Sequence, residues 1–359
     1  MKNLTLYIGT KRGLFIARSD ETRSSWSFDA PQLAGREVYH IVRDPRDGAV
    51  WVSTRHAVWG AHLHRSDDDG RTWHVLESAP HFPDGRGLHA IWCITPGPRG
   101  QPGRLYAGIE PAGLFASDDG GESWYGFDAL NEHPSRETWQ PAGNALALHS
   151  VIVDPDSERR IWCAVSAGGA FRTEDGGASW LPINDGVRAD YLLNPHPATG
   201  QCVHRMILHP ARPSRLYQQN HCGVYRSDDG GTRWTEITGD LPSEFGYVLA
   251  TDPGDPDSLY VVPEESSHMR TTCDGRLRVY RTRDSGHSWQ ALTHGLPQEN
   301  AWVSLLREAM CNDTLEPAGI YMATSTGHVF ASRDAGDTWH ALAAFFPRVI
   351  SLHAVVDDP

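Results

Sequence analysis

The stretch Ser66-Asp67-Asp68-Asp69-Gly70-Arg71-Thr72-Trp73 decides the fold, because its pattern returns along the whole chain. The pattern is Ser or Thr, one residue, Asp, one residue, Gly, two residues and then Trp. Five more copies follow, namely SDDGGESW ending at Trp124, TEDGGASW at Trp180, SDDGGTRW at Trp234, TRDSGHSW at Trp289 and SRDAGDTW at Trp339. A degraded copy precedes them, in which Ser19 and Asp20 lead to Trp26.

The spacing of these copies predicts the architecture. Successive Trp residues of the seven copies lie 47 to 56 positions apart. A repeat of this length is typical of one four-stranded blade of a β-propeller. We therefore predict an all-β, seven-bladed β-propeller that occupies residues 1–359 as a single domain.

The chemistry of the repeat favours a structural role. Its Asp carboxylate can accept hydrogen bonds from the backbone of its own turn, and the Gly that follows tolerates a positive φ. The Trp can pack its ring between blades and bury a large apolar area. We expect the six Asp residues to stabilise the fold rather than to catalyse a reaction.

The repeats resemble those of the BNR/Asp-box β-propellers, a superfamily that includes sialidases, xyloglucanases, sortilin-type receptors and photosystem II assembly factors. The resemblance covers the whole chain and implies the fold, whereas one fold hosts many activities. It also implies that ligands bind at the face opposite the boxes, at the mouth of the central channel. Sialidase activity is not expected, because the Phe/Tyr-Arg-Ile-Pro motif of those enzymes is replaced by Lys11-Arg12-Gly13.

The two ends of the chain are predicted to share one blade. The N-terminus begins with a strand of the second type (residues 4–8) and a strand of the third type (residues 13–18). The missing innermost strand is found at residues 349–356. Closing the ring in this way removes open sheet edges.

Histidines recur near the start of five innermost strands, at similar distances from the Pro that ends four of them. Because these strands converge on the axis, we expect their imidazoles to point into one end of the channel. Imidazole nitrogens suit zinc, iron or copper. We predict that at least three of the five bind one divalent transition metal ion; the alternative is that each bonds a nearby backbone carbonyl. The five are His40, His89, His149, His204 and His353.

Glu110 and His221 are the candidate catalytic residues, as a general base and as a further polar group at the same face. Other polar residues expected there are His56, Arg205, Glu264, Glu265 and His268, with Arg36, Arg55, Arg86 and Arg348 near the rim. We predict a metal-dependent hydrolase or oxidoreductase that acts on a small-molecule or glycan substrate. The alternatives are a non-catalytic binding or assembly propeller and a glycoside hydrolase of the Asp-box type.

The overall charge and composition restrict which classes of partner and which location are expected. A net charge of −13 argues against a nucleic-acid partner, which would need a clustered basic face. No apolar run approaches the roughly 18 residues of a membrane span, and the N-terminus lacks signal-peptide features. The six cysteines form no C-x-x-C pair, which predicts free thiols and a cytoplasmic location.

Overall fold

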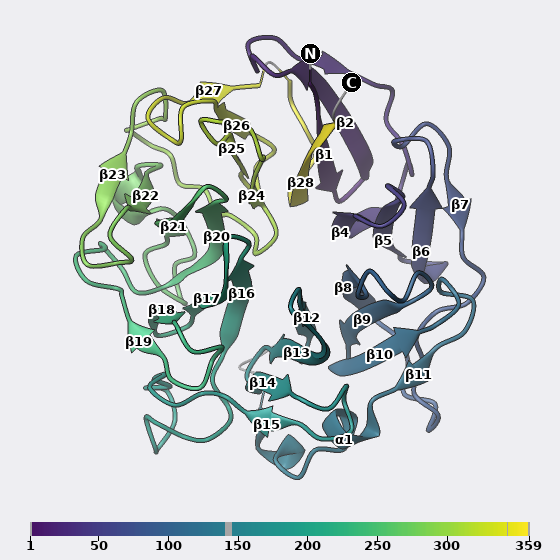
Figure 1. Cartoon of the computed structure of the whole chain (residues 1–359). Helices are drawn as coiled ribbons and strands as arrows, with labels where there is room; N and C mark the ends of the chain where they lie inside the picture. Colours follow the sequence, from purple (N-terminus) through teal and green to yellow (C-terminus); the bar gives the residue numbers. More distant parts are fainter. Residues whose placement is uncertain (1, 141–145, 343, 358–359) are drawn as a thin grey trace.

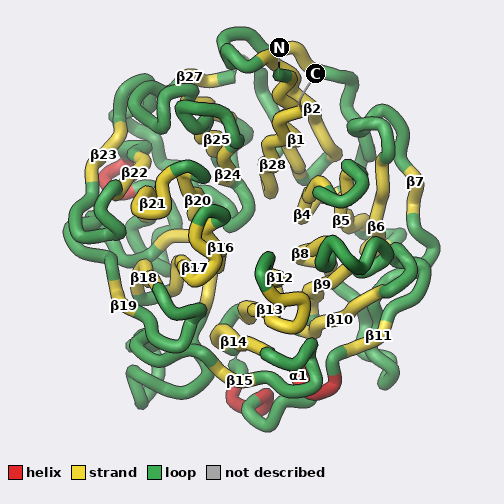
Figure 2. Tube along the Cα trace, viewed as in Figure 1, coloured by secondary structure: helices red, strands yellow, loops and turns green. Residues whose placement is uncertain are grey.

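The computed structural model describes residues 2–140, 146–342 and 344–357. Its strands form seven four-stranded sheets. The sheets stand around a central opening like the blades of a disc, and very little helix is present in the described part (Figures 1 and 2). The predicted all-β, seven-bladed propeller is therefore confirmed.

Each sheet has the same order from the axis outward. The innermost strands are β28 (Val349–Asp357), β4 (Glu37–Arg43), β8 (Ala90–Pro96), β12 (Leu148–Asp154), β16 (Val203–His209), β20 (Gly246–Asp252) and β24 (Met310–Asn312). The second strands are β1 (Asn3–Thr10), β5 (Val50–His56), β9 (Leu105–Glu110), β13 (Ser157–Val165), β17 (Arg212–Asn220), β21 (Asp255–Pro263) and β25 (Ile320–Ala323).

The outer half of each sheet is shorter. The third strands are β2 (Gly13–Asp20), β6 (Gly60–Ser66), β10 (Gly113–Ser117), β14 (Gly169–Thr173), β18 (Gly223–Ser227), β22 (Val279–Thr282) and β26 (Val329–Ser332). The outermost strands are β3 (Ser27–Phe28), β7 (His74–Val75), β11 (Tyr125–Gly126), β15 (Leu181–Pro182), β19 (Thr235–Glu236), β23 (Gln290–Leu292) and β27 (His340–Ala341). Short helices lie at α1 (Asp128–Asn131), Arg136–Thr138 and Cys273–Gly275.

The ring closes as predicted, through the first blade. Strand β1 pairs with β2 on one side and with β28 on the other, with Leu6 opposite Ala354 and Tyr7 opposite His353. The chain ends accordingly lie beside each other at the rim (Figure 1).

The repeat Trp residues contribute to the apolar core, which is divided into clusters between neighbouring blades. One cluster joins Trp162 of the fourth blade to Met206 and Trp234 of the fifth. The indole N–H of Trp234 donates to the Ile183 carbonyl of the preceding blade at 2.7 Å. Trp234 thus fixes the contact between two blades as well as filling space, and the Trp289 indole makes the same kind of bond, to the Ile237 carbonyl at 2.8 Å.

The six repeated turns share one hydrogen-bond pattern. In the turn of Asp119, Oδ1 accepts from Ser117 Oγ at 2.7 Å and from the Ser123 N–H at 2.9 Å, while Gly121 N–H donates to Ser117 Oγ at 2.8 Å. Hydrogen bonds from Ser123 and Ser117 lower the pKa of Asp119 to about 2. The same Ser or Thr to Asp bond occurs at Asp68, Asp175, Asp229, Asp284 and Asp334. This pattern fits the structural role expected of these Asp residues, whereas membership of the BNR/Asp-box superfamily stays a prediction.

Six of the innermost strands contain a register shift against the second strand. A shift of this kind is a β-bulge, which leaves a residue outside the ladder and turns its side chain in a new direction. The residues at the shifts are Ile350, Tyr39, Trp92, His149, His204 and the pair Tyr247–Val248. Only two of the five predicted histidines are among them, so the five do not occupy equivalent positions.

Candidate functional site

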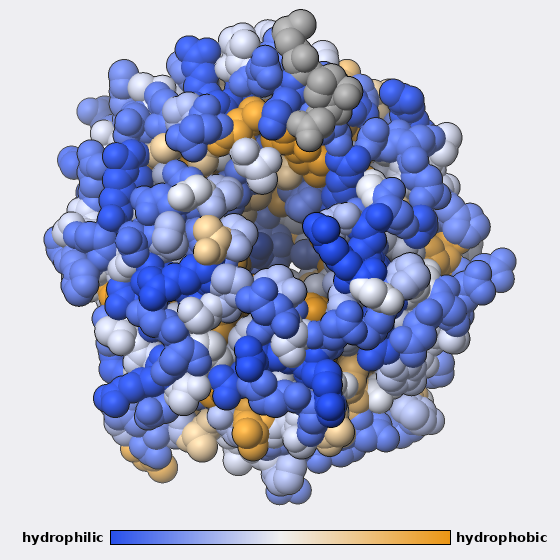
Figure 3. All heavy atoms as spheres, in the orientation of Figure 1, coloured by the Kyte–Doolittle hydropathy of each residue, from blue (hydrophilic) through white to orange (hydrophobic). Residues whose placement is uncertain are grey.

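A cavity of about 920 Å³ opens at one end of the channel. Most of the bulge residues line it, so the bulges aim side chains at this space. The cavity also holds three acids, four basic side chains, three histidines and a cysteine: Glu37, Glu110, Glu308, Lys11, Arg270, Arg307, Arg348, His89, His204, His221 and Cys202. Figure 3 shows that the centre of the disc is hollowed and that mainly hydrophilic residues surround the hollow on the face in view.

Glu110 lies in this cavity, at the end of β9. Its carboxylate is held from two sides, because His89 Nδ1 lies 2.6 Å from Oε1 and the Trp92 indole N–H donates to Oε2 at 2.8 Å. Glu110 is 7% exposed, whereas the side chain of His89 is 49% exposed. The pair therefore connects a nearly buried carboxylate to the cavity through an imidazole. Such an arrangement can move a proton to or from a bound molecule.

Glu308 is a second carboxylate of the cavity, and it is fixed in its ionised form. Arg205 contacts Oε1, and His40 Nδ1 lies 3.5 Å from Oε2. Burial alone would raise the pKa of Glu308, but Arg205 and His40 hold this pKa well below its ordinary value. The same ion pair keeps the pKa of the buried Arg205 guanidinium raised. The ionised form of Glu308 is thus stabilised at the channel wall.

The remaining basic groups give the cavity a positive surplus. Arg307 donates from Nε to the His204 carbonyl at 2.6 Å, and its guanidinium lies 5.0 Å from the centre of the Trp92 ring. Burial lowers the pKa of Arg307. Among the described residues, no carboxylate lies within ion-pair distance (4.0 Å) of Arg270, Arg307 or Arg348. These three side chains are therefore available to a negatively charged ligand.

Among the described residues, the ligand atoms of the five predicted metal-binding histidines do not form one group. His149 Nε2 bonds the Val203 carbonyl at 2.8 Å, and His353 Nε2 accepts the Arg43 N–H at 3.2 Å. His89 and His40 contact the carboxylates described above. In each of these four histidines, one ring nitrogen already contacts the neighbouring blade or a carboxylate. His149 and His204 each bond a backbone carbonyl, of Val203 and Gly246 respectively, as the alternative interpretation expects. Metal binding itself stays a prediction.

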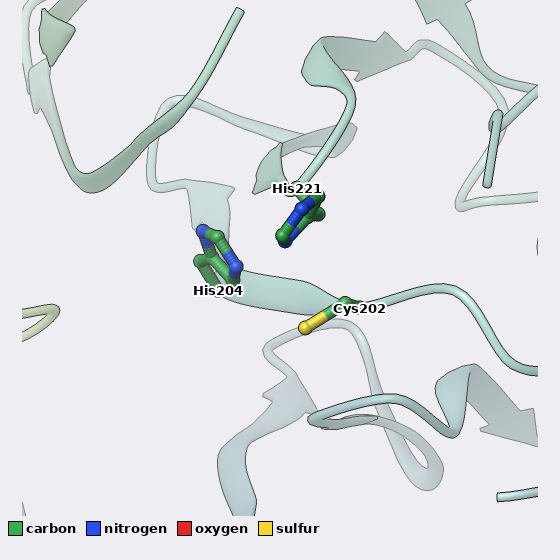
Figure 4. A group of neighbouring side chains, drawn as sticks. All are labelled: Cys202, His204 and His221. Atoms are coloured by element: carbon green, nitrogen blue, oxygen red, sulfur yellow. The ribbon is translucent and has the colours of Figure 1, made fainter. Parts of the chain in front are cut away.

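A different group of ligand atoms is present. Within the described parts of the chain, one set of at least three His, Cys, Asp or Glu residues has its ligand atoms within 4.8 Å of one another: Cys202, His204 and His221 (Figure 4). His204 belongs to the predicted metal set, and His221 is one of the two predicted catalytic residues. Cys202 was not among the predicted metal ligands, although it stands two positions before His204. That spacing was the available signal.

The other polar residues expected at this face are scattered. Arg348 lines the cavity, and Arg205 lies behind it against Glu308. Glu264 is fully buried, and Glu265 accepts the Asp274 N–H at 2.8 Å. Arg55 forms an ion pair with Glu37, the first residue of β4, at 3.8 Å, and Arg86 forms one with the loop residue Asp84 at 2.7 Å. His56 and His268 are absent from the cavity lining.

Trp92, Arg307 and Glu308 are among the cavity residues that were not predicted from the sequence. Trp92 lies on a bulge, and bulges leave no clear mark in a sequence. Arg307 and Glu308 lie in the seventh blade, where the usual Pro after the innermost strand is missing. The missing Pro was the sequence signal that could have indicated Arg307 and Glu308. In addition, all six cysteines are free, and no described helix is long and apolar enough to cross a membrane.

Comparisons with known proteins find relatives in sequence and in fold. No protein-family model matches the chain. The chain is 28% identical over 194 residues to a probable oligoxyloglucan-reducing end-specific xyloglucanase of Neosartorya fischeri. The aligned stretch covers 53% of this chain and 21% of that protein. The chain spans a quarter or less of the length of the curated relatives that it matches.

Two solved structures show how far the likeness extends in space. An ancestral GH74 enzyme has a TM-score of 0.59 at 16% identity, over 85% of this chain and 38% of that chain. The periplasmic gluconolactonase of Pseudomonas aeruginosa has a TM-score of 0.59 at 14% identity, over 98% of this chain and 99% of that chain. At these identities the likeness shows the fold alone. The chain is a seven-bladed β-propeller that resembles xyloglucanases and gluconolactonase-like propellers.

Proposed function

We propose that the protein is a hydrolase that acts on a carbohydrate bound in the channel-mouth cavity. The observation that carries this proposal is the presence of two carboxylates with different surroundings in one cavity, Glu110 and Glu308. Enzymes that hydrolyse glycosides use such a pair, one as the acid that protonates the leaving oxygen and one as an ionised carboxylate. The sequence similarity to xyloglucanases supports a carbohydrate substrate.

Each carboxylate has one role in this proposal. Glu110 supplies a proton to the half-exposed His89, which contacts it, and the His89 imidazole passes a proton from its other ring nitrogen to the leaving oxygen. Glu308, which Arg205 keeps ionised, stabilises the positive charge that develops on the sugar ring in the transition state. A water molecule in the open cavity supplies the attacking oxygen.

The aromatic residues of the cavity fit the same substrate class. Tyr39, Trp92 and Tyr247 line the wall, and Tyr39 packs edge-on against Trp92 with ring centres 5.1 Å apart. Flat apolar rings beside polar groups suit the mixed apolar and hydroxylated surface of a sugar. The cavity therefore offers both a surface that binds the ring and groups that act on it.

The test compares hydrolysis by the wild type and by a Glu110→Gln variant. The wild type should release reducing ends from oligosaccharides in a panel that includes xyloglucan fragments and uronate-containing fragments. Glu110→Gln keeps the shape of the side chain but cannot transfer the proton, so kcat/KM should fall by about 100-fold or more. The control Glu122→Gln alters an exposed residue of a repeated turn and should leave the rate unchanged.

Two results would contradict the proposal. One is a wild-type protein that binds the oligosaccharides in calorimetry but releases no reducing ends, which would favour a non-catalytic binding propeller. The other is a Glu110→Gln variant that melts like the wild type and keeps its full rate.

A further inference from the structure

We propose that Cys202, His204 and His221 form a binding site for a divalent transition metal ion of the zinc class, with its open positions facing the cavity. Their ligand atoms, one sulfur and two imidazole nitrogens, lie within 4.8 Å of one another. Around a tetrahedral zinc ion such atoms are separated by roughly 3.3–3.6 Å. Side-chain rotations that move the ligand atoms by about 1 Å therefore bring the three ligands to one ion, without a change in the backbone.

The backbone holds the three residues together. Cys202 directly precedes β16, His204 is at the bulge of that strand, and His221 lies in the turn between β17 and β18. The His221 N–H donates to the Cys202 carbonyl at 3.0 Å, which ties the turn to the start of the strand. The three side chains surround one small space (Figure 4). A preformed arrangement of this kind reduces the cost of ordering the ligands.

The hydrogen bond of His204 prepares this residue for a metal. Its Nδ1 lies 2.6 Å from the Gly246 carbonyl, and a carbonyl oxygen can only accept, so the proton is on Nδ1. The lone pair is then on Nε2, which is the nitrogen that remains for an ion. A backbone carbonyl that fixes the ring and tautomer in this way is the usual partner of a metal-binding histidine. His149, by contrast, has its Nε2 occupied by the Val203 carbonyl.

The surrounding charges determine what the ion would bind in turn. All three ligand residues line the cavity, and so do Arg270 and Arg307. Two guanidinium groups oppose a bound cation, but the thiolate of Cys202 cancels one unit of charge. Three protein ligands also leave a fourth position open, as in catalytic zinc sites. An anionic group such as a carboxylate or hydroxide at that position offsets the rest of the positive charge.

The test is a titration of the full-length, reduced protein with Co²⁺, which replaces zinc and reports a thiolate ligand through sulfur-to-cobalt charge-transfer absorption. We expect one equivalent of Co²⁺ to give that absorption and added Zn²⁺ to abolish it. Cys202→Ser should lose the charge-transfer band, and His221→Ala should weaken Co²⁺ binding at least tenfold. The matched controls are Cys222→Ser, at the neighbouring position of the same turn, and His268→Ala, an exposed histidine. Both controls should bind like the wild type.

The proposal is overturned if the wild type gives no charge-transfer band and retains no stoichiometric zinc, or if Cys222→Ser loses the band as Cys202→Ser does. His221→Ala, checked by its melting temperature, keeps the test decisive if Cys202→Ser does not fold. Because the readout is a spectrum of the resting protein, it stands apart from the hydrolysis assay. Either proposal can fail while the other holds.

Discussion

Glu264 follows β21 and is fully buried in the sixth blade. Its Oε1 accepts the Leu305 N–H at 2.9 Å, and Oε2 has no hydrogen-bond partner in the described parts of the chain. Burial raises the pKa of Glu264 from 4.5 to about 7. At a pH between 4.5 and about 7, Glu264 is therefore more protonated in the folded protein than in the unfolded chain. The contribution of Glu264 to stability is therefore complete below pH 4.5 and is lost as the pH rises through 7.

This carboxyl gives a prediction about pH. From pH 4.5 to pH 8, deprotonation of Glu264 should lower the free energy of unfolding by about 3 kcal/mol. Glu264→Gln cannot titrate, so it should lack this loss and be the more stable protein at pH 8. Urea unfolding of both proteins at pH 5 and pH 8 measures the difference, and the many other titrating groups cancel in the comparison. An identical pH dependence in the two proteins would show that Glu264 titrates normally.

Asp119 allows the structural role of the repeated turns to be tested. Asp119→Ala removes the acceptor for the Ser123 N–H and for two hydroxyl groups. Because the turn is exposed and water can replace part of the loss, we expect a decrease in stability of about 1 kcal/mol. Thermal or urea unfolding measures it. Hydrolysis by the folded variant should match the wild type; a lost rate with unchanged stability would instead give Asp119 a catalytic role.

Among the elements, β28 has the largest expected effect. It pairs with β1 over eight register positions and packs against the innermost strands of both adjacent blades. Deleting residues from Val349 onward would expose the edge of β1 and remove one wall of the channel. We expect the truncated chain to aggregate or to melt far below the full-length protein, as measured by light scattering and calorimetry. A soluble truncation with an unchanged melting temperature would contradict this.

The elements also show where sequence reasoning reached its limit. The spacing of the Trp residues predicts the number of blades, and the pattern of residues 349–356 predicts the strand that closes the ring. The side chains at the axis could not be predicted in the same way. A bulge adds one residue to one strand of a pair, and its position depends on packing rather than on residue type. This is why Tyr39 and Trp92, not His40 and His89, are at the bulges of their strands.

For the molecule as a whole, the sign of the net charge is opposite to the sign of the charge in the cavity. The net charge is −13, yet Arg270, Arg307 and Arg348 line one cavity with no carboxylate in ion-pair distance among the described residues. The excess of negative charge therefore lies elsewhere than in this cavity. Counting charges in the sequence argues against a nucleic-acid partner, but it says nothing about a small basic cavity. Only the ring arrangement brings these three residues together, because they lie in three separate loops, after β21, before β24 and before β28.

This surplus predicts a preference for acidic carbohydrates. Replacing Arg307 by Gln should weaken binding of a uronate-containing oligosaccharide at least tenfold, since hydrogen bonds between charged groups contribute about 1.5–3 kcal/mol. Binding of a neutral oligosaccharide of equal length should change by less than about twofold. Calorimetry measures both, and Arg86→Gln, which removes an arginine already paired with Asp84, is the control. Equal weakening of both ligands would assign Arg307 a structural role only.

The pairing of β1 with β28 has a consequence for the synthesis of the protein. Residue 3 meets residue 357, so the first blade remains incomplete until nearly the whole chain has left the ribosome. Until then, β1 presents an unpaired edge while the other blades assemble behind it. Contacts between such distant positions form late, because the entropy of closing a long loop must be overcome first. Docking of β28 is therefore expected to be the last step of folding, and until then the edge of β1 is open to pairing with other chains.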